Sequence, residues 1–92
     1  MPLSEGEGLY LAPCQSIHMI GMKYAIDAIF VDKKGAVVGL VKNIQPLSIS
    51  DYFWKAYGCL ELPSGTIDAT GTMIGDRLEF KEIAYRGNNS GV

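Results

Sequence analysis

Two side chains with metal-binding and nucleophilic chemistry stand close together near the start of the chain: Cys14 and His18 form the pattern Cys-x-x-x-His. A thiolate and an imidazole both bind zinc, but a structural zinc needs four ligands and a catalytic zinc at least three. Cys59 and Asp27 complete such a set only if the fold brings them to the same place. Because a single histidine in an apolar segment is more often a hydrogen-bonded structural residue, we predict neither a metal nor a cofactor.

The same residues suit a second chemistry, in which Cys14 is a nucleophile, His18 its base and Asp27 the group that orients the imidazole. No motif for an oxyanion hole accompanies them, and cysteine is commonly a small buried apolar residue. A thiol- or metal-dependent hydrolase using Cys14, His18 and Asp27 is therefore the alternative function rather than the leading one.

Asp27 interrupts the otherwise apolar run 24–31. A carboxylate near a core is unfavourable unless it is paired or hydrogen-bonded, so Asp27 needs a partner. We expect Arg77, Lys23 or the backbone N–H groups of the Gly21–Met22 bend to supply it. The favoured interpretation is a structural clamp that fixes the loop before the strand, and the functional alternative is a polar anchor at the floor of a binding cleft.

Three consecutive aromatic residues, Tyr52, Phe53 and Trp54, lie between Ser50 and Lys55. Three neighbouring aromatic side chains cannot all point inward from a strand or a short loop, so at least one is expected to be exposed. Exposed rings beside polar groups suit stacking on a sugar or contact with another protein. The alternative is that the run only forms a lid over one end of the fold.

Length and composition limit the classes of protein. The 92 residues, of which 48% are hydrophobic and 20% charged, predict one folded domain over 1–92 with a core at about 7–85 and a mobile tail at 86–92. The net charge of −2 and scattered basic residues give no reason to expect nucleic acid. No apolar run is long enough to span a membrane and Met1–Gly8 lacks the features of a signal peptide, so we expect a cytoplasmic protein. In that compartment two cysteines are thiols by default, although the two could be neighbours in space.

The local patterns predict a mainly β domain, a small antiparallel β-sandwich or barrel-like fold with one or two short helices. Gly35 is expected to adopt a positive φ in the turn Asp32–Gly35, and Gly71 to end one or two helical turns over 64–70. Segment 50–56 is either a short helix capped by Ser50 or an aromatic loop. The predicted strands are 24–31, 36–41, 57–62 and 77–85, the last with a bulge near Glu82.

Several short motifs together resemble the DUF192 family, also called UPF0127. They are Gly8-Leu-Tyr-Leu-Ala-Pro-Cys14, Ser16-Ile-His-Met-Ile-Gly-Met22, Ile26-Asp27, Phe30-Val-Asp32, Pro46, Leu60-Glu-Leu-Pro-Ser-Gly-Thr66, Gly71 and Gly75-Asp-Arg-Leu78. The resemblance covers roughly Glu7 to Phe80 and implies a compact, mainly β domain. It implies no reaction, because none is securely assigned to the family.

Members of that family usually carry further residues upstream, including an initial strand, so the resemblance implies a shortened member. A missing edge strand would leave backbone groups unpaired, and pairing with a second chain would satisfy them. We therefore expect a homodimer. Many relatives begin with a secretion signal or a membrane anchor, so a natural extension of this kind would make the protein secreted or membrane-anchored.

The leading hypothesis for function is a non-catalytic module that binds a small molecule or another protein. Its expected ligand-binding residues line a shallow pocket near the aromatic run: Ser16, His18, Met22, Asp27 and Trp54. The hypothesis requires His18 and Asp27 to lie on the same side of the fold.

Overall fold

The computed structural model describes residues 8–20 and 23–78 of the chain. These residues form four strands and one helix: β1 (Leu9–Leu11), β2 (Ile26–Val31), β3 (Val37–Ile44), β4 (Gly58–Pro63) and α1 (Thr66–Thr70). The strands make one antiparallel sheet in the order β1-β4-β2-β3. In the described part of the chain, no helix has the length and apolar character needed to cross a bilayer.

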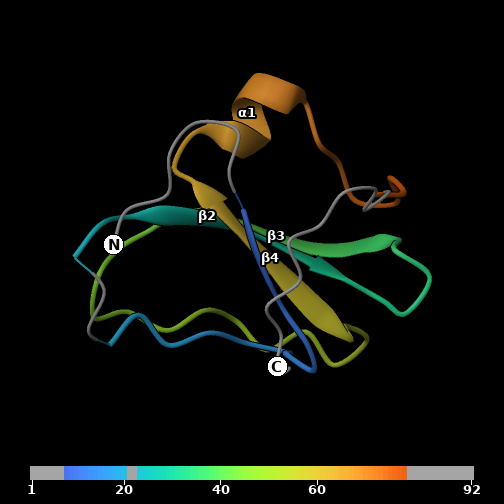
Figure 1. Cartoon of the computed structure of the whole chain (residues 1–92), viewed down its shortest axis with the longest axis horizontal. Coiled ribbons are helices and arrows are strands. Elements are labelled where there is room, and N and C mark those ends of the chain that lie inside the picture. The colour runs from blue at the N-terminus through green and yellow to red at the C-terminus, as the bar shows by residue number, and fades with distance from the viewer. Residues whose placement is uncertain (1–7, 21–22, 79–92) are drawn as a thin grey trace.

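The sheet lies between two other layers of chain. Figure 1 shows α1 on one side of the sheet and two long loops, residues 12–20 and 45–57, on the other. We call these two loops together the loop layer. The predicted mainly β fold with a short helix is confirmed, and the loop layer covers the sheet face that a second sheet would cover in a sandwich.

β2 is the centre of the fold, because all six of its residues are buried. Alternate residues of a strand point to opposite faces of the sheet, so β2 contributes to two cores. The buried members of the core under the loop layer are Ile17, Met19, Ile26, Ala28, Phe30, Ile44, Ala56 and Cys59. Those of the core under α1 are Ile29, Val31, Val37 and Ile67. Burial on both faces explains why this strand reads as a nearly continuous apolar run in the sequence.

The turn between β2 and β3 has the predicted form. Asp32 Oδ1 accepts hydrogen bonds from the N–H groups of Lys34 at 2.8 Å and Ala36 at 3.0 Å, and Gly35 has a φ of 87°. These backbone bonds hold the pKa of Asp32 below its ordinary value. The carboxylate therefore fixes the turn, and the glycine supplies the positive φ that other residues rarely adopt.

β3 contains a bulge opposite Asp27. Ile26 pairs with Ile44 and Ala28 pairs with Val41, so β3 has one more residue than β2 between these two pairs. Asn43 lies in this stretch with a φ of 53°. A bulge of this kind turns one residue out of the ladder. Here it frees the N–H of Asn43 to bond outside the strand pair.

The helix α1 and its end are as predicted, since Gly71 follows with a φ of 69° and its N–H donates to the carbonyl of Ile67. Segment 50–56 is a loop, not a helix. Ser50 does not cap a helix there, because its Oγ accepts the N–H of Ile17 from the other loop at 2.9 Å.

The predicted last strand is described only at its start. Arg77 makes an isolated bridge with Ala36, and the N–H of Leu78 donates to Gly35 at 2.8 Å. The rest of that strand, the bulge near Glu82 and the tail 86–92 lie outside the described residues.

Within the loop layer, residues 17–20 and 47–50 pair as a short ribbon. The N–H of Met19 donates to Ser48 at 2.8 Å, the N–H of Leu47 donates to Met19 at 3.0 Å, and the backbones of His18 and Ile49 form an isolated bridge. We call this pair of segments the loop ribbon. Its hydrogen bonds give the two loops a fixed mutual register, so the side chains between them have defined positions.

Phe53 attaches the loop layer to the sheet. Its ring packs on that of Phe30 with centroids 4.5 Å apart, and it lies directly over Gly39 of β3. A Cβ atom at position 39 would overlap the Phe53 ring. Gly39 is thus needed for the close approach of the two layers.

We expect Gly39→Ala to lower the free energy of unfolding by about 1–3 kcal/mol, because the added methyl group overpacks this contact. Urea denaturation measures the change. In a Phe53→Leu background the same substitution should destabilise the protein by clearly less, since the flat ring is gone. An equal loss in both backgrounds would contradict the assigned contact.

Candidate functional site

Asp27 is a charged residue with only 1% of its surface exposed. Its Oδ1 accepts the N–H of Asn43 at 2.8 Å, while its Oδ2 accepts the N–H groups of Gly65 at 3.1 Å and Ile67 at 2.7 Å. The first amides of a helix have no acceptor within the helix, and Gly65, the N-cap of α1, has no side chain to offer one. Asp27 supplies the acceptor from a neighbouring strand, and it joins β2 to both β3 and α1.

The predicted ion pairs of Asp27 with Arg77 and Lys23 are wrong. Arg77 Nη1 donates to the carbonyl of Lys34 at 2.8 Å, and Lys23 is exposed at the surface. Gly21 and Met22, whose N–H groups were the other expected partners, lie outside the described residues. Backbone amides satisfy this carboxylate because they reach the buried site without bringing a second charge into it.

His18 and Asp27 lie on opposite sides of the sheet. Asp27 bonds to α1, on the helix side. His18 is an exposed residue of the loop ribbon between two buried residues, Ile17 and Met19, which pack toward the sheet. Because the backbone there is extended, the His18 side chain points away from the sheet. The shared site that the sequence predicts for His18 and Asp27 is therefore not formed.

The hydrolase alternative lacks its geometry for the same reason. Asp27 cannot orient an imidazole on the other side of the sheet, and both of its oxygens accept backbone N–H groups. Among residues 8–20 and 23–78, no group of three or more His, Cys, Asp and Glu side chains is arranged to hold a metal ion.

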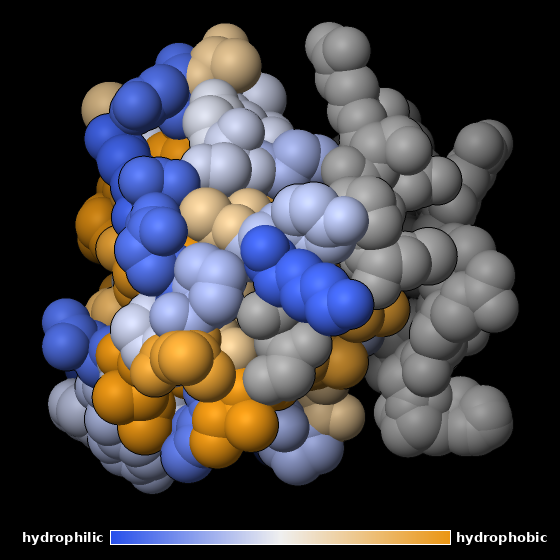
Figure 2. Space-filling model, turned by 90° about the vertical axis from the view of Figure 1, so that its left-hand side faces the viewer, coloured by the Kyte–Doolittle hydropathy of each residue, from blue (hydrophilic) through white to orange (hydrophobic). Residues whose placement is uncertain are grey.

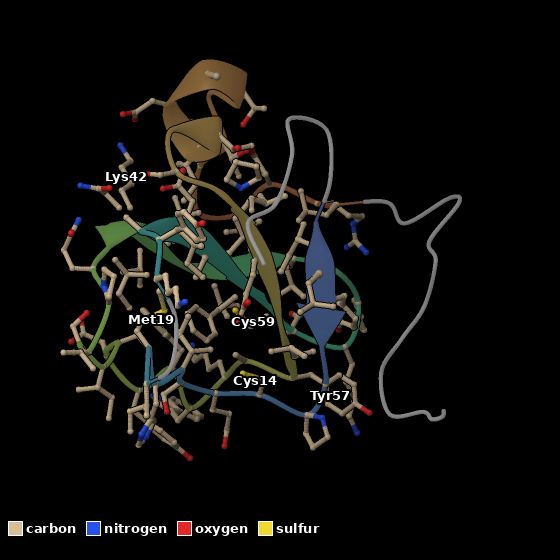
Figure 3. All side chains as sticks on the ribbon, turned by 60° about the vertical axis from the view of Figure 1, so that its left-hand side comes forward. Cys14, Met19, Lys42, Tyr57 and Cys59 are labelled. Atoms are coloured by element: carbon tan, nitrogen blue, oxygen red, sulfur yellow. The ribbon has the colours of Figure 1, made fainter. Side chains whose placement is uncertain are left out.

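The two cysteines meet between β4 and the loop layer. Figure 3 shows Cys59 on β4 and Cys14 on the loop segment beneath it. Cys59 is fully buried, and Cys14 packs against the same core cluster while staying partly exposed. The N–H of Cys14 donates to the carbonyl of Tyr57 at 2.8 Å, and its thiol donates to the carbonyl of Ser16 at 3.2 Å. These bonds hold Cys14 beside the first residues of β4.

The two thiols differ in how readily they ionise. Hydrogen bonding by the Cys59 thiol lowers the pKa of Cys14 below its ordinary value. The same interaction, together with burial, raises the pKa of Cys59 far above its ordinary value. A thiolate at Cys14 is therefore stabilised by its neighbour, and Cys14 is the thiol that ionises.

Glu61 is absent from the predicted site, although it lies beside these thiols. Its charge opposes the ionisation of both cysteines, and burial raises its own pKa. Cys59 and Glu61 are two residues apart on β4 and so share a face of the sheet. The sequence holds a signal for this placement: a carboxylate alternates with a cysteine inside an apolar strand.

The aromatic run is partly exposed, as predicted. Trp54 and Tyr52 keep 71% and 65% of their surface exposed, while Phe53 is half-buried. Gln15 attaches this run to the other loop, because its Nε2 donates to the Trp54 carbonyl and its Oε1 accepts the Tyr52 hydroxyl, both at 2.8 Å. Lys55 lies over the Trp54 ring, 5.2 Å from its centroid.

Of the other predicted site residues, Ser16 is half-buried in the loop layer and Met22 lies outside the described residues. Ser16, His18 and Trp54 thus lie in the loop layer, whereas Asp27 lies on β2.

The loop ribbon presents three large aliphatic side chains to solvent. Ile20, Leu47 and Ile49 are 74%, 81% and 60% exposed. We call these residues the ribbon patch. The backbone bonds between Met19 and Leu47, with the bridge from His18 to Ile49, bring the two segments together. Figure 2, which views the molecule from the left-hand side of Figure 1, shows apolar side chains gathered in the lower part of that face, at the level of the loop layer.

These observations define a mainly β domain with a structural helix side and a loop side that carries two thiols and exposed apolar groups. The chain belongs to the DUF192 family, described as "Uncharacterized ACR, COG1430", whose model matches residues 1–80. The resemblance found in the sequence motifs is thereby confirmed.

Two solved structures are similar to the chain. One is a protein of unknown function from Novosphingobium aromaticivorans, with a TM-score of 0.75 and 23% identity over 85% of this chain. The other is described as a proposed transcription regulator from Sinorhizobium meliloti, with a TM-score of 0.65 and 27% identity over 80% of this chain. The matches cover 60% and 56% of those two chains, so this chain spans little more than half of their length. No curated protein matches the chain.

We expect Asp27→Asn to lower the free energy of unfolding by about 2–5 kcal/mol, because an amide oxygen cannot replace both carboxylate oxygens and buried N–H groups lose their acceptor. Urea denaturation followed by circular dichroism measures the loss. The matched control is Asp51→Asn, which changes an exposed loop carboxylate and should alter stability by no more than about 0.5 kcal/mol. Similar small effects for both variants would contradict the clamp.

The pH dependence of alkylation tests the thiol pair. We expect iodoacetamide to modify Cys14 alone in the folded protein, with a half-maximal rate at a lower pH than for the same chain unfolded in urea. The reason is that the neighbouring thiol favours the Cys14 thiolate. In Cys59→Ala this midpoint should move to higher pH. An unchanged midpoint in that variant would show that Cys59 does not act on Cys14.

Proposed function

We propose that the protein is a non-catalytic interaction module that binds another protein through the outer surface of the loop layer. One observation carries this proposal: the ribbon patch exposes three large aliphatic side chains, Ile20, Leu47 and Ile49, at 74%, 81% and 60%. Single exposed apolar residues are normal on a protein surface, but three on one hydrogen-bonded ribbon are a candidate contact area.

The exposed fractions favour a protein over a small molecule as the partner. A side chain that lines a pocket is largely covered by its walls, whereas these three project into solvent. Burying such a side chain against a partner contributes about 1.5–3 kcal/mol, so three of them could form the apolar centre of an interface. Binding of a small molecule, the other possibility that the sequence predicts, stays a prediction.

The aromatic residues fit the same surface. Tyr52 and Trp54 are exposed on the loop layer and are fixed in position by Gln15. Aromatic side chains are enriched in protein interfaces, because they offer a large contact area with little loss of conformational entropy. His18 and Ser16 of the predicted site belong to this side of the molecule, and Asp27 does not take part.

The proposal allows two kinds of protein partner. A second copy of the chain would make the predicted homodimer, and a different protein would make a hetero-complex. Nucleic acid is not proposed, because the chain carries a net charge of −2. The cytoplasmic location stays a prediction, and the proposal does not depend on it.

Photocrosslinking tests this surface. A photoreactive phenylalanine derivative at position 47, in the full chain expressed in cells of its source organism, should give a discrete adduct of higher mass. An adduct of twice the chain mass identifies a homodimer, and any other mass a different partner. Adding Ile49→Asp should weaken the adduct severalfold, because a charge in the patch opposes burial.

The matched control carries the same derivative at Lys34, an exposed residue of the turn between β2 and β3. This position should give no such adduct. The proposal fails if position 47 yields no adduct, or if both positions yield the same set.

A further inference from the structure

The meeting of Cys14 and Cys59 is a feature that the interaction surface does not use. They come from different layers, with Cys14 on the first loop and Cys59 on β4. Both contribute to the core cluster under the loop layer, and both are free thiols. Figure 3 shows the Cys59 side chain on β4 above that of Cys14 on the loop segment.

We propose that Cys14 and Cys59 are a redox modification site, at which a reversible disulfide joins the loop layer to β4. The bond requires the sulfur atoms at about 2.05 Å, so its formation draws the loop segment around Cys14 toward the strand. The backbone bond from Cys14 to Tyr57 already holds that segment beside the start of β4. Only a local adjustment of the loop is then needed.

Exposure decides which thiol reacts first. Cys14 is partly exposed and reaches solvent, whereas Cys59 has 0% of its surface exposed. The interaction with Cys59 also favours the thiolate at Cys14. The thiolate is the nucleophile in thiol–disulfide exchange. Cys14 is thus the attacking residue, and Cys59 is the resolving residue that an outside reagent does not reach.

The oxidant in this proposal is a small-molecule disulfide, of which oxidised glutathione is an example. In the first step the Cys14 thiolate attacks one sulfur of the small disulfide, whose S–S bond breaks, and a small thiolate leaves. In the second step the Cys59 sulfur attacks the Cys14 sulfur of the mixed disulfide, and the second small thiol leaves with the Cys59 proton. The two protein thiols lose two electrons, and the small disulfide gains both.

The internal disulfide would close a loop that contains all of β2 and β3. Closing a long loop restricts the unfolded chain, so the oxidised protein should resist denaturant better than the reduced one. The bond would also fix the first loop, which carries His18 and Ile20, on the sheet. The site depends on the thiol pair alone and stands whether or not the ribbon patch binds a protein.

The test equilibrates the intact protein with mixtures of reduced and oxidised glutathione, quenches it with acid and a maleimide, and measures its mass. We expect one transition, in which the form with two maleimide labels is replaced by an unlabelled form that is about two hydrogen atoms lighter than the unlabelled reduced chain, as an S–S bond requires. Cys59→Ala should stop at the mixed disulfide on Cys14. Cys14→Ala should take up no glutathione while folded, because Cys59 is buried.

Measurements on the wild-type protein alone are enough to support or overturn the proposed disulfide. A peptide that links Cys14 to Cys59 after protease digestion, together with a higher urea midpoint for the oxidised protein, supports the site. Accumulation of the mixed disulfide alone, or thiols that stay reduced under fully oxidised glutathione, would overturn the proposal.

Discussion

The three hydrogen bonds that backbone amides donate to Asp27 are the interaction on which the rest of the structure depends. A charged group in a protein interior is strongly unfavourable unless its oxygens are satisfied. Asp27 is satisfied only when the bulge of β3 and the start of α1 both reach it. The positive φ of Asn43, the register shift between β2 and β3 and the position of α1 are thus parts of one arrangement.

This arrangement separates structural from chemical roles. Both oxygens of the Asp27 carboxylate accept hydrogen bonds from backbone N–H groups, so this carboxylate stabilises the fold on the helix side of the sheet. The two thiols and the ribbon patch belong to the loop side. Phe53 and the loop ribbon give the loops enough order to present defined surfaces without regular secondary structure. The DUF192 domain therefore offers a thiol pair beneath the loop layer and a candidate contact area on its outside.

The features that depend on neighbouring residues could be predicted from the sequence. β2, the turn at Asp32 and the end of α1 at Gly71 follow from local apolar patterns and from glycines that adopt positive φ. The partners of Asp27 could not be predicted, because they lie 16, 38 and 40 residues away along the chain. Ser50 illustrates the same limit, since its hydroxyl bonds across to Ile17 instead of capping a helix. The triad of Cys14, His18 and Asp27 looked plausible because their order in sequence does not reveal which face of the sheet each occupies.

Hydrogen exchange of individual amides, followed by nuclear magnetic resonance, tests the Asp27 clamp most directly. The first amides of a short helix are ordinarily unprotected, because no carbonyl of that helix accepts them. With Asp27 as their acceptor, the amides of Gly65 and Ile67 should exchange slowly, together with that of Asn43 and with the ladder amides of β2. Exchange of these three amides at the rate of an unstructured peptide, while the β2 amides remain protected, would contradict the account.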